Sequence, residues 1–152
     1  MSLYRLLLGL VFTASQVSIL AQDHGHVVPS EVLVVSTSDD GKPQLAMLAF
    51  KSESGKRMLQ MVATFHGPAR FKLQTGDTAW INLADGSSVI LECVKGARAI
   101  TELPNSVGFF ELAWAKEQRL KQLAMVSVTF RIGSETFTFP INQSRWAFRD
   151  TF

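Results

Sequence analysis

Two histidines near the N-terminus stand where they could bind a transition metal. If a signal peptidase cuts after Ala21, the mature chain begins Gln22-Asp23-His24. A free amine, two backbone amides and a third-position imidazole can surround Cu(II) or Ni(II) in the square plane that these ions favour. His26 would add a further ligand. The alternative is a polar leader that binds no metal, and cyclisation of Gln22 would destroy the amine.

No arrangement of residues in the sequence predicts catalysis. The sequence has no Gly-x-Ser-x-Gly elbow, phosphate-binding glycine loop, Cys-x-x-Cys pair or His-Glu-x-x-His motif. His66 follows an expected strand and is interpreted as a loop residue. Asp39 and Asp40 precede Gly41, so we interpret them as turn formers. We do not interpret them as the catalytic carboxylate pair of a glycosidase or as a calcium site. We therefore predict no catalytic residue and no cofactor.

The tryptophans suggest a function other than catalysis, which is binding through exposed rings. Trp114 and Trp146 lie near the ends of expected elements, where a ring is left exposed more readily than inside a strand. Exposed tryptophan rings stack on sugars or anchor protein partners. The alternative is that these rings, together with eleven phenylalanines, fill the core of a domain without disulfides.

The N-terminus predicts an export signal. Arg5 supplies a positive charge, the run from Leu6 to Phe12 is apolar, and Ala21 places a small residue at a cleavage site. The apolar run is too short for a spanning helix, which needs roughly 20 apolar residues. We therefore expect a periplasmic or secreted protein with no membrane span once the signal has been removed.

Charge and cysteine content limit what the exported part can be. We expect residues 1–21 to be the signal peptide, residues 22–30 a flexible leader, and residues 31–152 a single β-rich domain.

A net charge of +2 gives no field that would attract nucleic acid. Cys93 is the only cysteine, so core packing alone must hold the domain. We interpret Cys93 as a small buried apolar residue.

Apolar runs alternate with turn residues along the domain, which predicts strands joined by hairpins. The clearest hairpin spans Val126 to Ile141, with Gly133-Ser134 as a two-residue loop whose glycine suits a positive φ. This loop fixes the register. The apolar face then carries the pairs Phe130–Phe137 and Val128–Phe139, and the opposite face carries Arg131–Thr136 and Thr129–Thr138.

Two further hairpins follow from Ser-Gly and Asp-Gly dipeptides. Ser54-Gly55 is predicted to be a two-residue loop that pairs Phe50 with Leu59, in a central hairpin covered on both sides. Asp85-Gly86 fits better in a three-residue loop with a bulge, because that loop gathers the apolar residues of both strands on one face. Those residues are Ile81, Leu83, Val89 and Leu91.

One helix is predicted over residues 115–124, which are rich in helix-forming residues. Glu117 and Lys121 stand four apart in the favourable order, and Leu120 and Leu123 would lie on the sheet. We expect the stretch before this helix to be a loop.

The predicted fold class is mainly β (α+β). We expect an antiparallel sheet or sandwich built from hairpins, with one short helix near residues 115–124. Asn142 could cap a second, short helix at the C-terminus.

The order of expected elements from Trp80 onward includes Leu120-Lys121-Gln122-Leu123, followed by a strand with Phe130-Arg131-Ile132. This C-terminal half resembles small exported β-rich bacterial proteins with no assigned function. The resemblance implies an exported β-rich domain, and no functional residue transfers from it.

The sequence favours an exported, non-enzymatic module that binds a protein or a glycan through Trp114 and Trp146. Two alternatives remain open. One is an extracytoplasmic hydrolase whose site carries no known motif, and the other is a small outer-membrane barrel.

Overall fold

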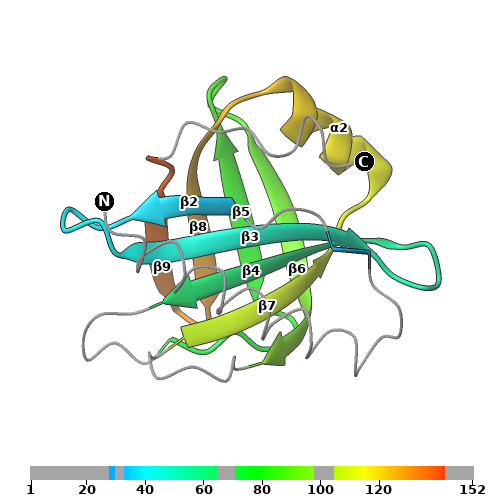
Figure 1. The fold of residues 1–152 in the computed structure, drawn as a ribbon, viewed down its shortest axis with the longest axis horizontal. Helices are drawn as coiled ribbons and strands as arrows, with labels where there is room; N and C mark the ends of the chain where they lie inside the picture. The colour runs from blue at the N-terminus through cyan, green and yellow to red at the C-terminus, as the bar shows by residue number, and fades with distance from the viewer. Residues whose placement is uncertain (1–27, 30–32, 65–70, 98–104, 143–152) are drawn as a thin grey trace.

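The computed structural model describes residues 28–29, 33–64, 71–97 and 105–142 (Figure 1). These residues form one curled antiparallel sheet, nearly barrel-shaped, and a single short helix, which confirms the predicted fold class. Its elements are β1 (Val28–Pro29), β2 (Leu33–Thr37), β3 (Pro43–Lys51), β4 (Arg57–Thr64), β5 (Thr78–Leu83), β6 (Ser88–Ala97), β7 (Asn105–Glu111), α2 (Trp114–Gln122), β8 (Met125–Ile132) and β9 (Glu135–Pro140).

The strand order places β7 in the middle of the sheet, although it comes late in the chain. The order is β1-β3-β4-β7-β6-β5-β8-β9, and β2 also pairs with β3. Figure 1 shows β2, β3, β4 and β7 running across the strands β5, β6, β8 and β9. No helix in the described segments has the length and apolar character needed to cross a membrane.

The hairpin of β8 and β9 has the predicted register. Phe130 lies opposite Phe137, Val128 opposite Phe139, and Thr129 opposite Thr138. Gly133 has a φ of +59°, a conformation that glycine adopts without strain. Turn chemistry and the alternating apolar pattern together fix this register, as the sequence indicated.

The hairpin at Asp85-Gly86 has the predicted three-residue loop, but the one at Ser54-Gly55 does not have the predicted two-residue loop. Lys51 pairs with Arg57 and Phe50 pairs with Met58, so the predicted register was wrong by one residue. The N–H of Gly55 donates to the carbonyl of Ser52, and Gly55 has a φ of +79°. This is a type I turn followed by a glycine bulge, which also places its glycine at a positive φ.

β3 and β4 are covered on both faces, as predicted. One face belongs to the interior core of the curled sheet. The other face forms a second buried apolar cluster with β7, made of Leu48, Phe50, Val62, Val107 and Phe109.

The strand β7 was predicted to be a loop, which was wrong. Asn105, Ser106 and Gly108 weaken the apolar pattern of this segment. The structure nevertheless pairs it along its length with β4 and buries Asn105 through Phe110. Tertiary pairing therefore overrides a weak local preference for strand.

Asn142 joins the two ends of the sheet. Its backbone N–H donates to the Val35 carbonyl at 3.2 Å. Its side-chain amide donates to the Thr37 carbonyl at 2.6 Å, and its amide oxygen accepts the Thr37 N–H at 2.9 Å. Asn142 was predicted to cap a helix, but its side chain is bonded to β2 instead. The predicted helix itself lies outside the described residues.

The segment that precedes β5 closes one end of the interior core. Phe71 packs edge-on against Phe130 at 5.3 Å and Phe137 at 5.0 Å between ring centroids. Leu73 is buried, and its N–H donates to the Ser106 hydroxyl at 2.8 Å. Gly96 lies directly against this segment, because a Cβ on Gly96 would be 1.9 Å from the Leu73 carbonyl oxygen.

Candidate interaction surface

The outer face of β5 and β6 carries apolar side chains that point away from the core. Residues alternate along β6, so that Leu91 and Cys93 are buried while Ile90 and Val94 are 44% and 45% exposed. Trp80 of β5 lies directly opposite Ile90 and is half-buried. Directly opposed residues in a sheet share a face, so Trp80 and Ile90 form one apolar strip.

Trp114 lies at the start of α2, the helix that follows β7. Cys93 pairs with Phe110, so the chain that continues from β7 into α2 returns toward Ile90. The ammonium group of Lys116 donates to the Ile90 carbonyl at 2.7 Å, which brings α2 next to β6. Trp114 is 68% exposed, the largest exposure among the large apolar side chains described. Its exposure agrees with the sequence-based expectation.

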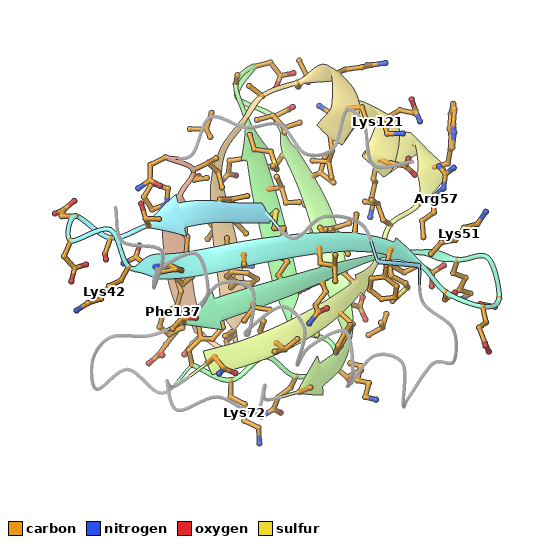
Figure 2. All side chains as sticks on the ribbon, viewed as in Figure 1. Lys42, Lys51, Arg57, Lys72, Lys121 and Phe137 are labelled. Atoms are coloured by element: carbon orange, nitrogen blue, oxygen red, sulfur yellow. The ribbon has the colours of Figure 1, made fainter. Side chains whose placement is uncertain are left out.

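A buried carboxylate fixes the position of α2, and with it the position of Trp114. Glu117 is fully buried, and its two oxygens lie 2.5 Å from the Arg57 guanidinium and 2.9 Å from the Lys121 ammonium group. Arg57 comes from the start of β4, and Figure 2 shows it with Lys121 on the side of the molecule where α2 lies. The predicted Glu117–Lys121 pair is therefore present, while the contact with Arg57 was not foreseen. Losing one partner of such a buried pair is costly, so it holds the helix firmly.

Polar side chains on the same outer face bond mainly to one another. The Asn82 amide donates to the Ser127 hydroxyl at 2.9 Å, and the Asn82 oxygen accepts from Ser88 at 2.7 Å. Thr129 and Thr138 share a hydrogen bond of 3.0 Å. These contacts use many of the groups that would otherwise bind a polar ligand.

We use the term docking patch for the apolar strip of Trp80, Ile90 and Val94 together with Trp114 of the adjoining helix α2. Charged groups surround it, as at the rims of protein interfaces. The Arg131 guanidinium lies 5.5 Å from the centroid of the Trp80 ring, a cation–π distance. Lys116 is exposed beside Ile90, and Glu92 is exposed between Ile90 and Val94.

The other sequence-predicted site residues are not brought to this surface by the described structure. Trp146, His24 and His26 lie outside the described residues, and so does His66. Asp40 is a turn former as predicted, since its carboxylate bonds to Ser38. Lys42 and Ser38 hold the pKa of Asp40 well below its usual range.

Cys93 is a buried apolar residue, as predicted. Burial raises the pKa of its thiol above the ordinary value, with smaller contributions from the nearby charges of Asp77 and Glu92. Within the described ranges, no group of three or more histidine, cysteine or carboxylate side chains is arranged to hold a metal ion.

Ile90 and Val94 were not among the predicted site residues, although the sequence around them carries a signal. The run Val89-Ile90-Leu91-Glu92-Cys93-Val94 is apolar at almost every position. A strand with one face on the core buries only alternate residues. The second apolar row therefore had to be covered by something else or exposed.

Comparisons with known proteins give no relative from which a function could be inferred. No family model, curated protein or solved structure matches this chain.

Proposed function

We propose that this protein is an exported, non-enzymatic binding module that holds a protein partner on the docking patch. The observation that carries the proposal is the exposure of large apolar side chains on β6 and on the adjoining helix α2. Four large apolar side chains are exposed in the described part of the chain, and Ile90, Val94 and Trp114 of the docking patch are three of them. Exposed apolar side chains that include a tryptophan and have charged neighbours are typical of a protein-binding site.

The polar groups of the same face favour a protein over a glycan as the partner. A glycan site needs free donors and acceptors beside an aromatic ring. Here Asn82, Ser88 and Ser127 already bond to one another, and Arg131 lies over the Trp80 ring. The exposed aliphatic groups of Ile90 and Val94 offer a sugar no hydrogen bond.

Several groups that could take part in catalysis have structural roles instead. Burial keeps the Cys93 thiol neutral by raising its pKa, whereas a cysteine nucleophile needs a thiolate. Hydrogen bonds from Ser87 lower the pKa of Asp85, so this carboxylate stays ionised and is unsuited to act as a general acid. Glu117 holds α2 in place through Arg57.

The proposed location outside the cytoplasm rests on the sequence. Arg5, the apolar run to Phe12 and the small residue Ala21 have the order of a signal peptide. The domain would then meet its partner in the periplasm or outside the cell.

Site-specific photo-crosslinking in producing cells tests the proposal. We expect a photoreactive phenylalanine analogue at position 90 to yield a discrete adduct with a second protein. The matched control is the same analogue at Val126, which is 52% exposed on β8 and does not belong to the docking patch. Equal adducts from both positions, or adducts from position 126 alone, would contradict the proposed surface. A glycan partner that is lost on Trp80→Ala, with no protein adduct at position 90, would overturn the protein assignment.

A further inference from the structure

The outer edge of β9 has backbone groups that pair with no described residue, and the register fixes their direction. The N–H of Ile141 donates to the Val126 carbonyl at 2.9 Å, so these two residues form a hydrogen-bonded pair. Hydrogen-bonded pairs alternate with non-hydrogen-bonded pairs along an antiparallel ladder. Thr136 and Thr138 occupy the non-hydrogen-bonded positions opposite Arg131 and Thr129. Their N–H and C=O groups therefore point away from β8.

The same outward row has no available donor at its next two positions. Asn142 uses its N–H on the Val35 carbonyl of β2, and Pro140 has no N–H to offer. Thr136 and Thr138 are both exposed, and no described residue bonds to their outward backbone groups. The open edge therefore consists of two residues, Thr136 and Thr138, and ends at Pro140. A proline at a sheet edge commonly limits strand pairing.

We propose that two copies of this chain pair through this edge, with antiparallel β9 strands related by a twofold axis at Phe137. In this register Thr136 lies opposite Thr138 of the second copy, and each such pair exchanges two hydrogen bonds. The twofold axis generates the second pair, so all the free outward groups of Thr136 and Thr138 are used. Pro140 lies opposite Ser134 of the second copy, beyond the last hydrogen-bonded pair.

A second copy fits this edge better than a longer foreign strand does. A longer strand would extend past Thr138 to Pro140, where no donor exists, and to Asn142, whose N–H is already bonded. The twofold register also offsets the two Glu135 side chains by four residues, or roughly 13 Å along the strand, so like charges do not oppose each other.

The paired edge is distant from α2, and the strand β8 separates it from Trp80. Figure 1 places β9 and α2 on opposite sides of the molecule, and Figure 2 shows Phe137 far from Arg57 and Lys121. A dimer formed through β9 would present two docking patches, which raises the apparent affinity for any partner with repeated sites. The pairing of this edge involves no residue of the docking patch.

Sedimentation velocity of the purified full chain tests the pairing. Because the interface is small, we expect a monomer–dimer equilibrium that shifts toward dimer between about 10 µM and about 1 mM. Thr138→Pro removes one outward donor and should give monomer across this range, while the matched control Thr138→Ala keeps the backbone N–H and should dimerise as the wild type does. A monomeric wild type at about 1 mM, or dimerisation of folded Thr138→Pro, would overturn the proposal.

Disulfide trapping tests the register without removing a backbone donor. A mixture of the Thr136→Cys and Thr138→Cys variants should form a crosslinked heterodimer on mild oxidation, because the two positions face each other across the axis. Each variant alone should crosslink at least about tenfold less. Residues at the same position are then more than roughly 8 Å apart, beyond the Cα separation that a disulfide spans. Equal crosslinking of either variant with itself would contradict the twofold axis at Phe137.

Discussion

Replacing Gly96 with alanine is expected to destabilise the protein by about 3 kcal/mol or more. A Cβ at this position would be 1.9 Å from the carbonyl oxygen of Leu73 and 2.8 Å from its carbonyl carbon. Both are backbone atoms, so a change of side-chain rotamer cannot relieve the contact. Either β6 or the segment at Leu73 would have to move.

Hydrogen bonds on both sides of the contact resist that movement. The Leu73 N–H is bonded to the Ser106 hydroxyl at 2.8 Å. The Gly76 N–H is bonded to the Cys93 carbonyl at 2.8 Å, and the Cys93 N–H to the Asp77 carbonyl at 2.8 Å. Moving the segment would break part of this network and uncover the core beneath Leu73.

Gly133→Ala is the matched control for Gly96→Ala. Gly133 has a φ of +59° and open space around its Cα, so an alanine there would clash with no atom. Its only penalty would be the preference of non-glycine residues for a negative φ. That preference costs about 1–2 kcal/mol. Urea titrations followed by circular dichroism measure both variants. A Gly96→Ala variant that is as stable as Gly133→Ala would show that the segment at Leu73 does not lie against β6.

Phe130→Ala is expected to lower the free energy of unfolding by about 3–5 kcal/mol. The Phe130 ring is fully buried at the centre of an aromatic cluster. Its centroid lies 5.3 Å from that of Phe71, 5.8 Å from Phe139 and 6.5 Å from Phe110. Truncation would leave a cavity among rings that come from separate parts of the chain, and these cannot all close in together.

The neighbouring residue Thr129 provides the control for Phe130. Thr129 lies on the outer face, where its hydroxyl bonds to Thr138 at 3.0 Å and accepts from Asn82 at 3.3 Å. Thr129→Ala should cost only about 1 kcal/mol, because water replaces these bonds at an accessible surface. Equal losses for Phe130→Ala and Thr129→Ala in a urea titration would show that the two faces of β8 have been assigned wrongly.

The hairpin of β8 and β9 could be predicted because two independent signals agreed there. The glycine of Gly133-Ser134 suits a two-residue loop, and the apolar residues then align on one face. The hairpin at Ser54-Gly55 gave no such agreement, because β3 and β4 are apolar on both faces. A shift of one residue in register then changes no apolar pattern, so the sequence could not distinguish the two turn types.

β7 and the buried Glu117 could not be predicted for a related reason. Asn105, Ser106 and Gly108 are poor strand formers, and only their pairing with β4 makes them a strand. Glu117 is charged and belongs to a helix with a largely polar sequence, so nothing local indicates burial. Its burial depends on Arg57, which is 60 residues away in the chain.

The candidate site was only partly visible in the sequence. The position of Trp114 near the end of an element predicts an exposed ring, and the structure exposes it. Trp80 lies inside a strand and was not singled out from the sequence. Ile90 and Val94 are candidates for binding because they are exposed on β6, next to α2. The Lys116 contact with the Ile90 carbonyl holds α2 beside this strand.

The affinity of the docking patch for its crosslinked partner tests the central claim most directly. Isothermal titration calorimetry should compare the wild type with Trp114→Ala and with the off-patch control Val126→Ala, after melting temperatures have shown that both variants are folded. We predict at least about a tenfold loss of affinity for Trp114→Ala, because a tryptophan anchor contributes more than 1.4 kcal/mol to binding. Val126→Ala should bind as tightly as the wild type. Unchanged binding by a folded Trp114→Ala variant would contradict the assignment of this surface.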